Sequence, residues 1–307
     1  MSRIGFAGIG RMGLPMCANL VKAGHEVTAC DVRAEQREAA IACGARWSPD
    51  PGEVAATADV FITMLPGPPE VRDLMLRGGV AEALPPKSVW VDMTSNSPEV
   101  VRPIRERLLA RGVRVLEAPV GGGPAESRDG SLKLFIGGEA DLVDRLRPLL
   151  EVLGDPDRIA LVGGHGHGYT AKLLVNLLWF GQAVATAEAL LLGKSAGLDL
   201  GVLRDVLRDS AAAGSFLHHD LDALFAGDYL RSFGLDRVCE ELTALTELAH
   251  DHGTPFALSD VVARVHQRAL ARYGPADGEL LAVALLEEDA GLQLRAPRPS
   301  TSDEVGD

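Results

Sequence analysis

The sequence predicts a doubly wound α/β domain followed by an all-helical domain. In the first half, short apolar runs rich in β-branched residues alternate with helical stretches, which is the pattern of a parallel sheet built from βαβ units. After residue 168 the strand pattern stops, and long helical periods continue to about residue 294. A segment rich in glycine and histidine, 163–168, separates the two patterns. We therefore expect an α/β domain over 1–163 and a helical domain over 164–294.

The first domain contains seven expected strands, each a short apolar run bounded by turn residues. Their ranges are 3–9, 26–31, 59–65, 88–92, 114–118, 133–136 and 158–162. Helices are expected between the strands, for example over 12–23 and 98–111, and a long helix over 172–193 opens the second domain. The end of the chain, 295–307, is rich in Pro, Ser and acidic residues, a composition that predicts disorder.

Composition excludes several classes of protein. The 307 residues leave room for two cores, and the formal net charge of −13 argues against a nucleic-acid or anionic-membrane partner, which would attract a basic surface. The four cysteines form no C-x-x-C pair and no metal-ligand spacing, and His165 and His167 lack a third ligand, so we expect free thiols, no metal and a cytoplasmic location.

One segment is long and apolar enough to require a membrane test. Residues 173–192 contain no Lys or Arg and a single acid, Glu188, over the length that a membrane span needs. The same segment contains Asn176, Gln182 and Thr186, and no basic cluster follows it closely. We interpret it as a helix buried on all sides between the domains, and predict no membrane partner.

A glycine motif, Gly8-Ile9-Gly10-Arg11-Met12-Gly13, directly follows the first expected strand and opens a helix. In this G-x-G-x-x-G arrangement the first glycine permits a tight turn, the second lets the backbone approach a pyrophosphate, and the third lets the helix pack close to the sheet. The phosphates then meet the N–H groups at the helix N-terminus. The motif predicts a Rossmann dinucleotide-binding domain.

The residue that ends the second expected strand bears on the choice of dinucleotide. Asp31 lies 18 residues after Gly13, where a carboxylate can accept both ribose hydroxyl groups of NAD and repels the 2′-phosphate of NADP. Arg33 follows two residues later and could reach a phosphate. We predict NAD as the cofactor and keep NADP as the less favoured alternative.

A second informative stretch opens the long helix. Lys172 and Asn176 are four residues apart and therefore share one helix face, which Trp179 continues. A lysine at this place could be a solvated surface charge, but the helix dipole favours acids rather than bases near an N-terminus. We therefore treat Lys172 as a candidate functional residue.

Several motifs, taken together, resemble those of the β-hydroxyacid dehydrogenase family, which includes 3-hydroxyisobutyrate dehydrogenase and tartronate semialdehyde reductase. Their order and spacing cover roughly residues 3–290. The motifs are the glycine signature within 5–20, the strand end Ile62-Thr63-Met64-Leu65-Pro66, the loop Asp92-Met93-Thr94-Ser95, the loop Glu117-Ala118-Pro119-Val120-Gly121-Gly122-Gly123, and Gly166-x-Gly168-x-x-x-Lys172-x-x-x-Asn176.

This resemblance implies NAD-dependent hydride transfer to or from a small 3-hydroxyacid or semialdehyde-type substrate, with Lys172 as general acid/base and Asn176 orienting the substrate. Substrate contacts are implied for Ser95, Gly121, Gly122, Gly123 and Trp179. Cofactor contacts are implied for Gly8, Ile9, Gly10, Arg11, Met12, Gly13, Asp31, Arg33, Met64, Leu65, Pro66, Thr94 and Ser95. The resemblance further implies a homodimer or homotetramer formed through the helical domains, with the active site between the domains.

Three positions depart from the family pattern. Gly121 replaces a serine that binds the substrate carboxylate, Val175 replaces the first of two asparagines, and Glu240 replaces a lysine that approaches the cofactor. These departures indicate a substrate of different shape or charge from the usual one. Two alternatives therefore stay open: an imine reductase on the same scaffold, whose members usually lack the lysine, and a catalytically silent dinucleotide-binding protein.

Overall fold

The computed structural model describes residues 1–297, so most of the segment predicted to be disordered lies outside the described residues. The chain divides into two compact units, Met1–Leu173 and Leu174–Asp307. The sequence placed the division after residue 163. In the structure, Tyr169 is fully buried in the core of the first unit, and the start of the long helix is therefore counted with that unit.

The first unit contains a nine-stranded sheet among its described residues, in the order β3-β2-β1-β4-β5-β6-β8-β7, with β9 paired to β8. Strands β1 to β6 are all parallel to one another, as predicted. The strands are β1 (Arg3–Ala7), β2 (Glu26–Cys30), β3 (Arg46–Trp47), β4 (Val60–Thr63), β5 (Val89–Asp92), β6 (Arg114–Glu117), β7 (Val120–Gly121), β8 (Leu132–Gly137) and β9 (Gly154–Gly163).

The far edge of the sheet differs from the all-parallel prediction. Strand β8 is antiparallel to both β6 and β7, whereas β9 returns parallel to β8. The connection from β7 to β8 contains only the short helix α7 (Pro124–Asp129), and such a connection is too short for the crossover that parallel strands require. The two strands that the sequence did not predict, β3 and β7, have two residues each, too few to show a periodic pattern.

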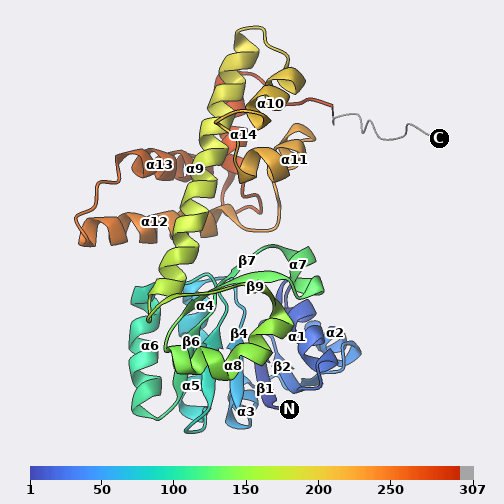
Figure 1. Ribbon diagram of the computed structural model, residues 1–307, viewed down its shortest axis with the longest axis vertical. Coiled ribbons are helices and arrows are strands. Elements are labelled where there is room, and N and C mark those ends of the chain that lie inside the picture. The colour runs from blue at the N-terminus through green and yellow to red at the C-terminus, as the bar shows by residue number, and fades with distance from the viewer. Residues whose placement is uncertain (298–307) are drawn as a thin grey trace, which may run out of the picture. The chain divides into compact units, whose positions relative to one another are not determined.

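Helices cover both faces of the sheet, which confirms the doubly wound architecture (Figure 1). On one face, apolar side chains of α1 (Gly13–Lys22), α2 (Gln36–Ala42) and α8 (Ala140–Leu153) pack on the strands. The other face is covered by α3 (Pro51–Ala56), α4 (Pro68–Arg72), η1 (Asp73–Arg77), α5 (Val80–Ala83) and α6 (Pro98–Ala110). The expected helices over 12–23 and 98–111 correspond closely to α1 and α6.

The described part of the second unit, 174–297, is built from helices, as predicted, with one isolated β-bridge between Gly234 and Asp277. Helix α9 (His167–Ser195) begins in the first unit and continues into this one. It is followed by α10 (Leu200–Arg208), η2 (Phe216–Asp220), α11 (Leu221–Phe225), α12 (Leu235–Asp251), α13 (Ala257–Tyr273) and α14 (Leu281–Ala290). A core around Leu190, Phe216, Leu224 and Val283 joins α9 to η2, α11 and α14.

Helix α9 is long and apolar enough to cross a membrane by length and composition alone, a test that core helices of soluble proteins also pass. Only 39% of its most apolar 18-residue window is buried, so the expected burial on all sides is wrong for this chain. The exposed apolar side chains on α9 include Leu174, Val175, Leu178 and Leu192.

Candidate active site

The glycine motif forms the turn between β1 and α1. Gly8 has φ +93°, and a Cβ there would lie 2.2 Å from the carbonyl oxygen of Met64. A Cβ on Gly13 would lie 1.9 Å from the carbonyl oxygen of Gly8. By contrast, the space around Gly10 is open, with only an Arg33 guanidinium nitrogen near, at 3.4 Å. Gly8 and Gly13 are therefore required by the turn itself, whereas Gly10 keeps a surface clear for a ligand.

This turn fits the phosphates of a dinucleotide. Helix α1 begins at Gly13, and no described side chain caps its N-terminus. The N–H groups of Leu14 and Met16 donate to the carbonyl oxygens of Gly10 and Met12, and Pro15 has none, so the donors to a ligand would be the backbone N–H groups of the turn that precedes Leu14. An anion at that place is stabilised by these donors and by the positive end of the helix dipole. The residues present therefore match the requirements of the pyrophosphate group.

The predicted cofactor residues collect at one edge of the sheet. Asp31 follows β2, the glycine turn follows β1, Met64-Leu65-Pro66 follows β4, and Thr94-Ser95 follows β5. These four strands are adjacent and parallel, so their carboxyl ends meet at the same edge. Open α/β sheets bind ligands outside this edge. The structure therefore brings together all the predicted cofactor-binding positions.

The Asp31 carboxylate is already held in place. It accepts hydrogen bonds from the backbone N–H of Ile9 at 2.9 Å and from the backbone N–H of Arg33 at 3.0 Å. The Arg33 guanidinium also pairs with it, with Nε 3.1 Å from Oδ1. Burial raises the pKa of Asp31, but the bonds from Arg33 and Ile9 outweigh this and hold the pKa below its ordinary value. The side chain thus remains an ionised acceptor.

A buried carboxylate, Asp92, organises the loops that follow β4 and β5. It accepts a hydrogen bond from the hydroxyl group of Thr63 at 2.7 Å and another from the backbone N–H of Thr94 at 3.2 Å. The hydroxyl oxygen of Thr94 in turn accepts the N–H of Leu65 at 3.1 Å. The two loops are therefore joined by hydrogen bonds, which leaves the half-buried Ser95 at the open end.

The start of α9 is held by a second buried carboxylate. Glu117, the last residue of β6, accepts the backbone N–H of Gly166 at 2.6 Å, and the ring Nδ1 of His165 lies 3.8 Å from the same oxygen. Burial raises the pKa of Glu117 to about 7, while the Gly166 N–H works in the opposite direction. This contact places the beginning of the helix that carries Lys172.

The expected substrate loop, Gly121–Gly123, is only partly available to an anion. The backbone N–H of Gly123, one of the expected substrate contacts, donates to Oε2 of Glu126 at 2.8 Å and is therefore occupied by the chain's own carboxylate. A Cβ on Gly121 would lie 3.2 Å from the Phe135 ring. The aromatic ring thus narrows the space that a serine at 121 would need.

Lys172 and Asn176 lie on adjacent turns of α9, and both are half-buried. The Asn176 amide donates to Oε2 of Glu241 on α12 at 2.7 Å. The sequence had singled out Glu240 instead. In the structure Glu240 is an exposed partner of Arg237 at 3.0 Å, while Glu241 is buried. An acid inside the apolar stripe of α12 was the signal that could have identified Glu241.

Trp179, expected to contact the substrate, packs within the helical unit. Its indole N–H donates to Asp220 at 2.8 Å, and its ring meets those of Phe180 and Phe216 edge to face. The only hydrogen-bond donor of this side chain is therefore used inside the unit.

No group of three or more metal-ligating side chains exists among residues 1–297. The four cysteines are free thiols. The histidines at 167, 218, 219, 250 and 252 are exposed.

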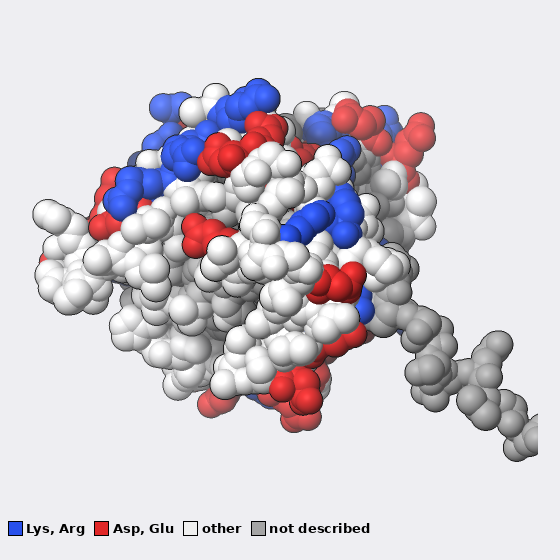
Figure 2. Space-filling model, turned by 90° about the horizontal axis from the view of Figure 1, so that it is seen from above, with Lys and Arg blue, Asp and Glu red and all other residues white. Residues whose placement is uncertain are grey.

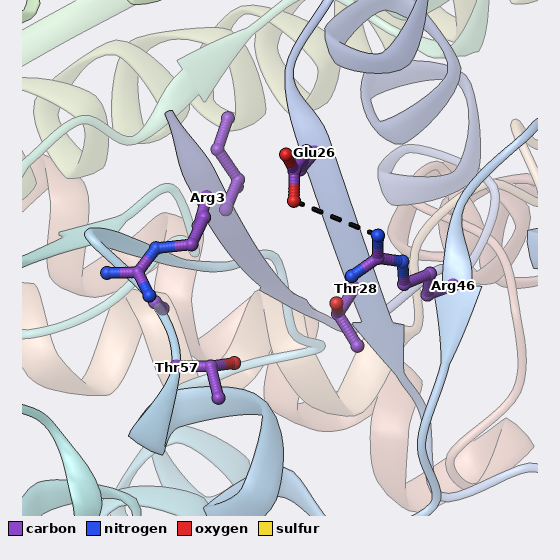
Figure 3. Close-up of a pocket in the computed structure, with 7 residues that line it drawn as sticks. Arg3, Glu26, Thr28, Arg46 and Thr57 are labelled. Carbon is purple, nitrogen blue, oxygen red and sulfur yellow. Dashed lines mark ion pairs between the residues drawn. The ribbon is translucent and has the colours of Figure 1, made fainter. Parts of the chain in front are cut away.

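A separate pocket of about 250 Å³ lies at the amino ends of β1 and β2, away from the glycine turn (Figure 3). Arg46 lies 3.8 Å from Glu26 at its wall, and Arg3 pairs with Asp59. Its two arginines are thus engaged by acids, and the pocket takes no part in the dinucleotide site.

Comparisons with known proteins agree with this arrangement. The NAD-binding domain of 6-phosphogluconate dehydrogenase matches residues 3–164, and the NAD-binding domain of NADP-dependent 3-hydroxyisobutyrate dehydrogenase matches residues 166–286. A 3-hydroxyisobutyrate dehydrogenase of Pseudomonas aeruginosa is 37% identical over 212 residues, 69% of this chain and 70% of the relative. A 3-sulfolactaldehyde reductase of Escherichia coli is 30% identical over 273 residues, 88% of this chain and 91% of the relative.

Solved structures show the same fold. The 3-hydroxyisobutyrate dehydrogenase of Mycobacterium tuberculosis, solved with L-serine, superposes with a TM-score of 0.82 at 28% identity and covers 93% of this chain and 99% of its own. An imine reductase of Streptomyces aurantiacus superposes with a TM-score of 0.60 at 22% identity, over 92% of this chain and 99% of its own, a likeness that concerns the fold alone.

Proposed function

Because this chain belongs to the β-hydroxyacid dehydrogenase family of NAD(P)-dependent oxidoreductases acting on CH–OH groups, we propose that it transfers hydride between NAD and a small 3-hydroxyacid or the matching semialdehyde. The relatives named above act on 3-hydroxyisobutyrate and 3-sulfolactaldehyde, each a small molecule with a hydroxyl or aldehyde group and an acidic group. One observation carries the proposal: the α/β unit contains both Lys172 and a glycine turn with open space at Gly10. The start of α9, the helix that bears Lys172, is fixed to this unit by Glu117.

The protein's own residues would divide the chemistry as follows. The nicotinamide, when bound, supplies the hydride acceptor or donor. Lys172 would take the hydroxyl proton when the alcohol is oxidised and return a proton to the oxygen when the carbonyl is reduced. Asn176, held by Glu241, would orient the substrate through its amide. Gly122 would offer a backbone N–H to the substrate's acidic group, since that of Gly123 is held by Glu126.

The direct test replaces Lys172. We expect Lys172→Ala to lower kcat by about 10²–10⁴-fold, the usual contribution of a general acid/base, while NADH binding changes little. Turnover is measured with 3-hydroxyisobutyrate, L-serine, a semialdehyde and a cyclic imine. Unchanged turnover in Lys172→Ala would exclude the mechanism, and a wild-type preference for the cyclic imine would favour an imine reductase.

We propose NAD rather than NADP as the preferred cofactor, on the strength of the ionised Asp31 at the end of β2. The Arg33 guanidinium, although close to Gly10, is drawn to Asp31 and partly neutralises it. We expect Arg33→Ala to weaken NADP about tenfold, roughly 1.4 kcal/mol, while NAD binding stays within about threefold. Titration of both cofactors by fluorescence checks this, and a wild-type preference for NADP would refute the assignment.

We also propose a homo-oligomer, a dimer or tetramer, in the cytoplasm. The helical unit exposes large apolar side chains on three helices, among them Leu178 on α9, Val202 on α10 and Leu258 on α13. Figure 2 shows broad areas without charged side chains, with basic and acidic groups interspersed around them. Exposed apolar faces of this kind favour association between copies. Sedimentation of the purified chain, with Val202→Glu as the disrupting variant, tests the proposal.

A further inference from the structure

We propose that Tyr169 is a positioning residue for Lys172: its hydroxyl group, bonded to Asp92, ties the first turn of α9 to the loop that carries Thr94 and Ser95. The inference rests on the proposed role of Lys172 and assigns how that residue is brought into register with the cofactor loop. All the residues in the argument belong to the first unit.

The acceptor, Asp92, is a fully buried carboxylate at the carboxyl end of β5. Two donors reach each of its oxygens. Oδ1 accepts from the Thr63 hydroxyl and the Thr94 N–H, and Oδ2 accepts from the Asn96 amide at 2.9 Å and the Tyr169 hydroxyl at 2.9 Å. Three of the four donors come from β4 or from the loop after β5. Tyr169 alone comes from α9.

Tyr169 is suited to act as a rigid connector. Its side chain is fully buried in the core that contains Trp90, Val101 and Val115, so the ring has a single place. Burial together with the Asp92 charge raises the pKa of Tyr169 well above its ordinary value, so the hydroxyl keeps its proton and donates at any physiological pH. Lys172 follows three residues later, one turn along the same side of the helix.

A second anchor acts on the residues just before Tyr169. Glu117 accepts the N–H of Gly166, and a Cβ on Gly168 would lie 2.8 Å from the Phe135 carbonyl oxygen, so the helix start sits directly on β6 and β8. The Glu117 contact fixes where α9 begins. The Tyr169 bond adds a direct polar link from the first turn of α9 to Asp92, the residue that organises the loop after β5.

The expected consequence is catalytic rather than global. A displacement of about 1 Å at a reacting group can lower the rate about 10²-fold, because acid/base transfer needs hydrogen-bond geometry. Removing the Tyr169 hydroxyl leaves the ring in the core and Asp92 with three donors. The first turn of α9, which precedes Lys172, then loses its hydrogen bond to the carboxylate that holds the cofactor loop.

The test is Tyr169→Phe, assayed with NAD and 3-hydroxyisobutyrate, or with the panel compound that turns over fastest. We expect kcat to fall about 10–100-fold, KM for NAD to stay within about twofold, and the deuterium isotope effect on kcat to rise as hydride transfer becomes slower. Amide hydrogen exchange over residues 166–172 should become faster in the variant, a readout that needs no turnover.

The control is Thr63→Val, which removes another hydroxyl donor of the same Asp92 carboxylate, one that lies on β4 rather than on α9. It also removes the acceptor of the buried Trp90 indole N–H, at 3.0 Å, which adds to its cost in stability. We expect this variant to lose stability but to keep kcat within about threefold and exchange over 166–172 unchanged. Equal losses of kcat in both variants, or unchanged kcat and exchange in Tyr169→Phe, would overturn the positioning role. Activity that survives Lys172→Ala would instead overturn the proposed function, so the two failures are distinguishable.

Discussion

The two units of this chain hold their functional side chains by different means. In the α/β unit the site is set by the backbone: Gly8 and Gly13 allow contacts that no side chain would permit, and Asp92 and Glu117 hold loops from inside the core. In the helical unit one side-chain pair, Asn176 with Glu241, performs the same task. A site that depends on backbone conformation is recognisable in the sequence as a glycine motif. A contact between two side chains far apart in the sequence is not, because neither residue is unusual by itself.

The largest effect of a substitution on the free energy of unfolding is expected at the glycine turn. Gly13→Ala forces a Cβ against the Gly8 carbonyl oxygen, and we expect it to lower the free energy of unfolding by about 3 kcal/mol, the upper end of overpacking costs. Gly10→Ala is the matched control. It should leave stability within about 1 kcal/mol but weaken NAD at least tenfold, because its Cβ occupies the clear surface. Urea unfolding and NAD titration separate the two. A stable Gly13→Ala variant would mean that the turn is not rigid.

The buried Glu117 predicts a pH effect confined to the α/β unit. Its pKa is about 7 in the fold against 4.5 ordinarily, so between these values the folded state holds a proton that the unfolded state has lost. Stability therefore falls as pH rises from about 4.5 to 7, by roughly 3 kcal/mol. The charged or titratable groups that interact with Glu117 include Arg105, Asp92, His165 and Tyr169.

The variant that isolates this effect is Glu117→Gln. The free energy of unfolding of the variant minus that of wild type should increase by up to about 3 kcal/mol as the pH rises from 4.5 to 7.5. Urea unfolding at both pH values measures this difference. Glu106→Gln removes an exposed carboxylate from α6 and serves as control, with the wild-type pH dependence retained. Parallel pH curves for Glu117→Gln and wild type would show that Glu117 is not protonated in the fold.

In the helical unit the expected effect is smaller and catalytic. Glu241→Gln weakens the charged acceptor of the Asn176 amide, and we expect kcat to fall about tenfold, since a hydrogen bond to a charged group contributes about 1.5–3 kcal/mol. Its neighbour provides the control: Glu240→Gln removes an exposed pair with Arg237 and should change kcat less than twofold. A larger fall in kcat for Glu240→Gln than for Glu241→Gln would show that Glu240, the position singled out from the sequence, is the one that matters for catalysis.

The features that the sequence could predict are local ones, and those that it could not predict depend on contacts between distant residues. The glycine turn, Asp31 and the parallel strands were predictable because each depends on local chemistry or on spacing within one element. The antiparallel β8 was not, since strand direction depends on how a connection closes in three dimensions. The bond from Tyr169 to Asp92 joins residues 77 positions apart, and that from Asn176 to Glu241 joins residues 65 apart. Neither spacing carries a periodic signal.

The Gly121 and Glu240 departures illustrate the limit within a motif. The surroundings of these two positions in the structure decide what they do. Gly121 faces the Phe135 ring, and Gly123 is occupied by Glu126, an acid to which the motif gave no role. Glu240 points to Arg237 at the surface. Side-chain direction on a helix or loop is settled by packing, which the motif does not encode.

The central claim is that Lys172 moves a proton while hydride is transferred, and rescue of Lys172→Ala by methylamine tests it most directly. We expect the variant to be nearly inactive alone and its NAD-dependent turnover to rise in proportion to added amine, because a free amine can replace the missing base. Lys172→Ala turnover equal to wild type without amine would contradict a proton-transfer role for Lys172.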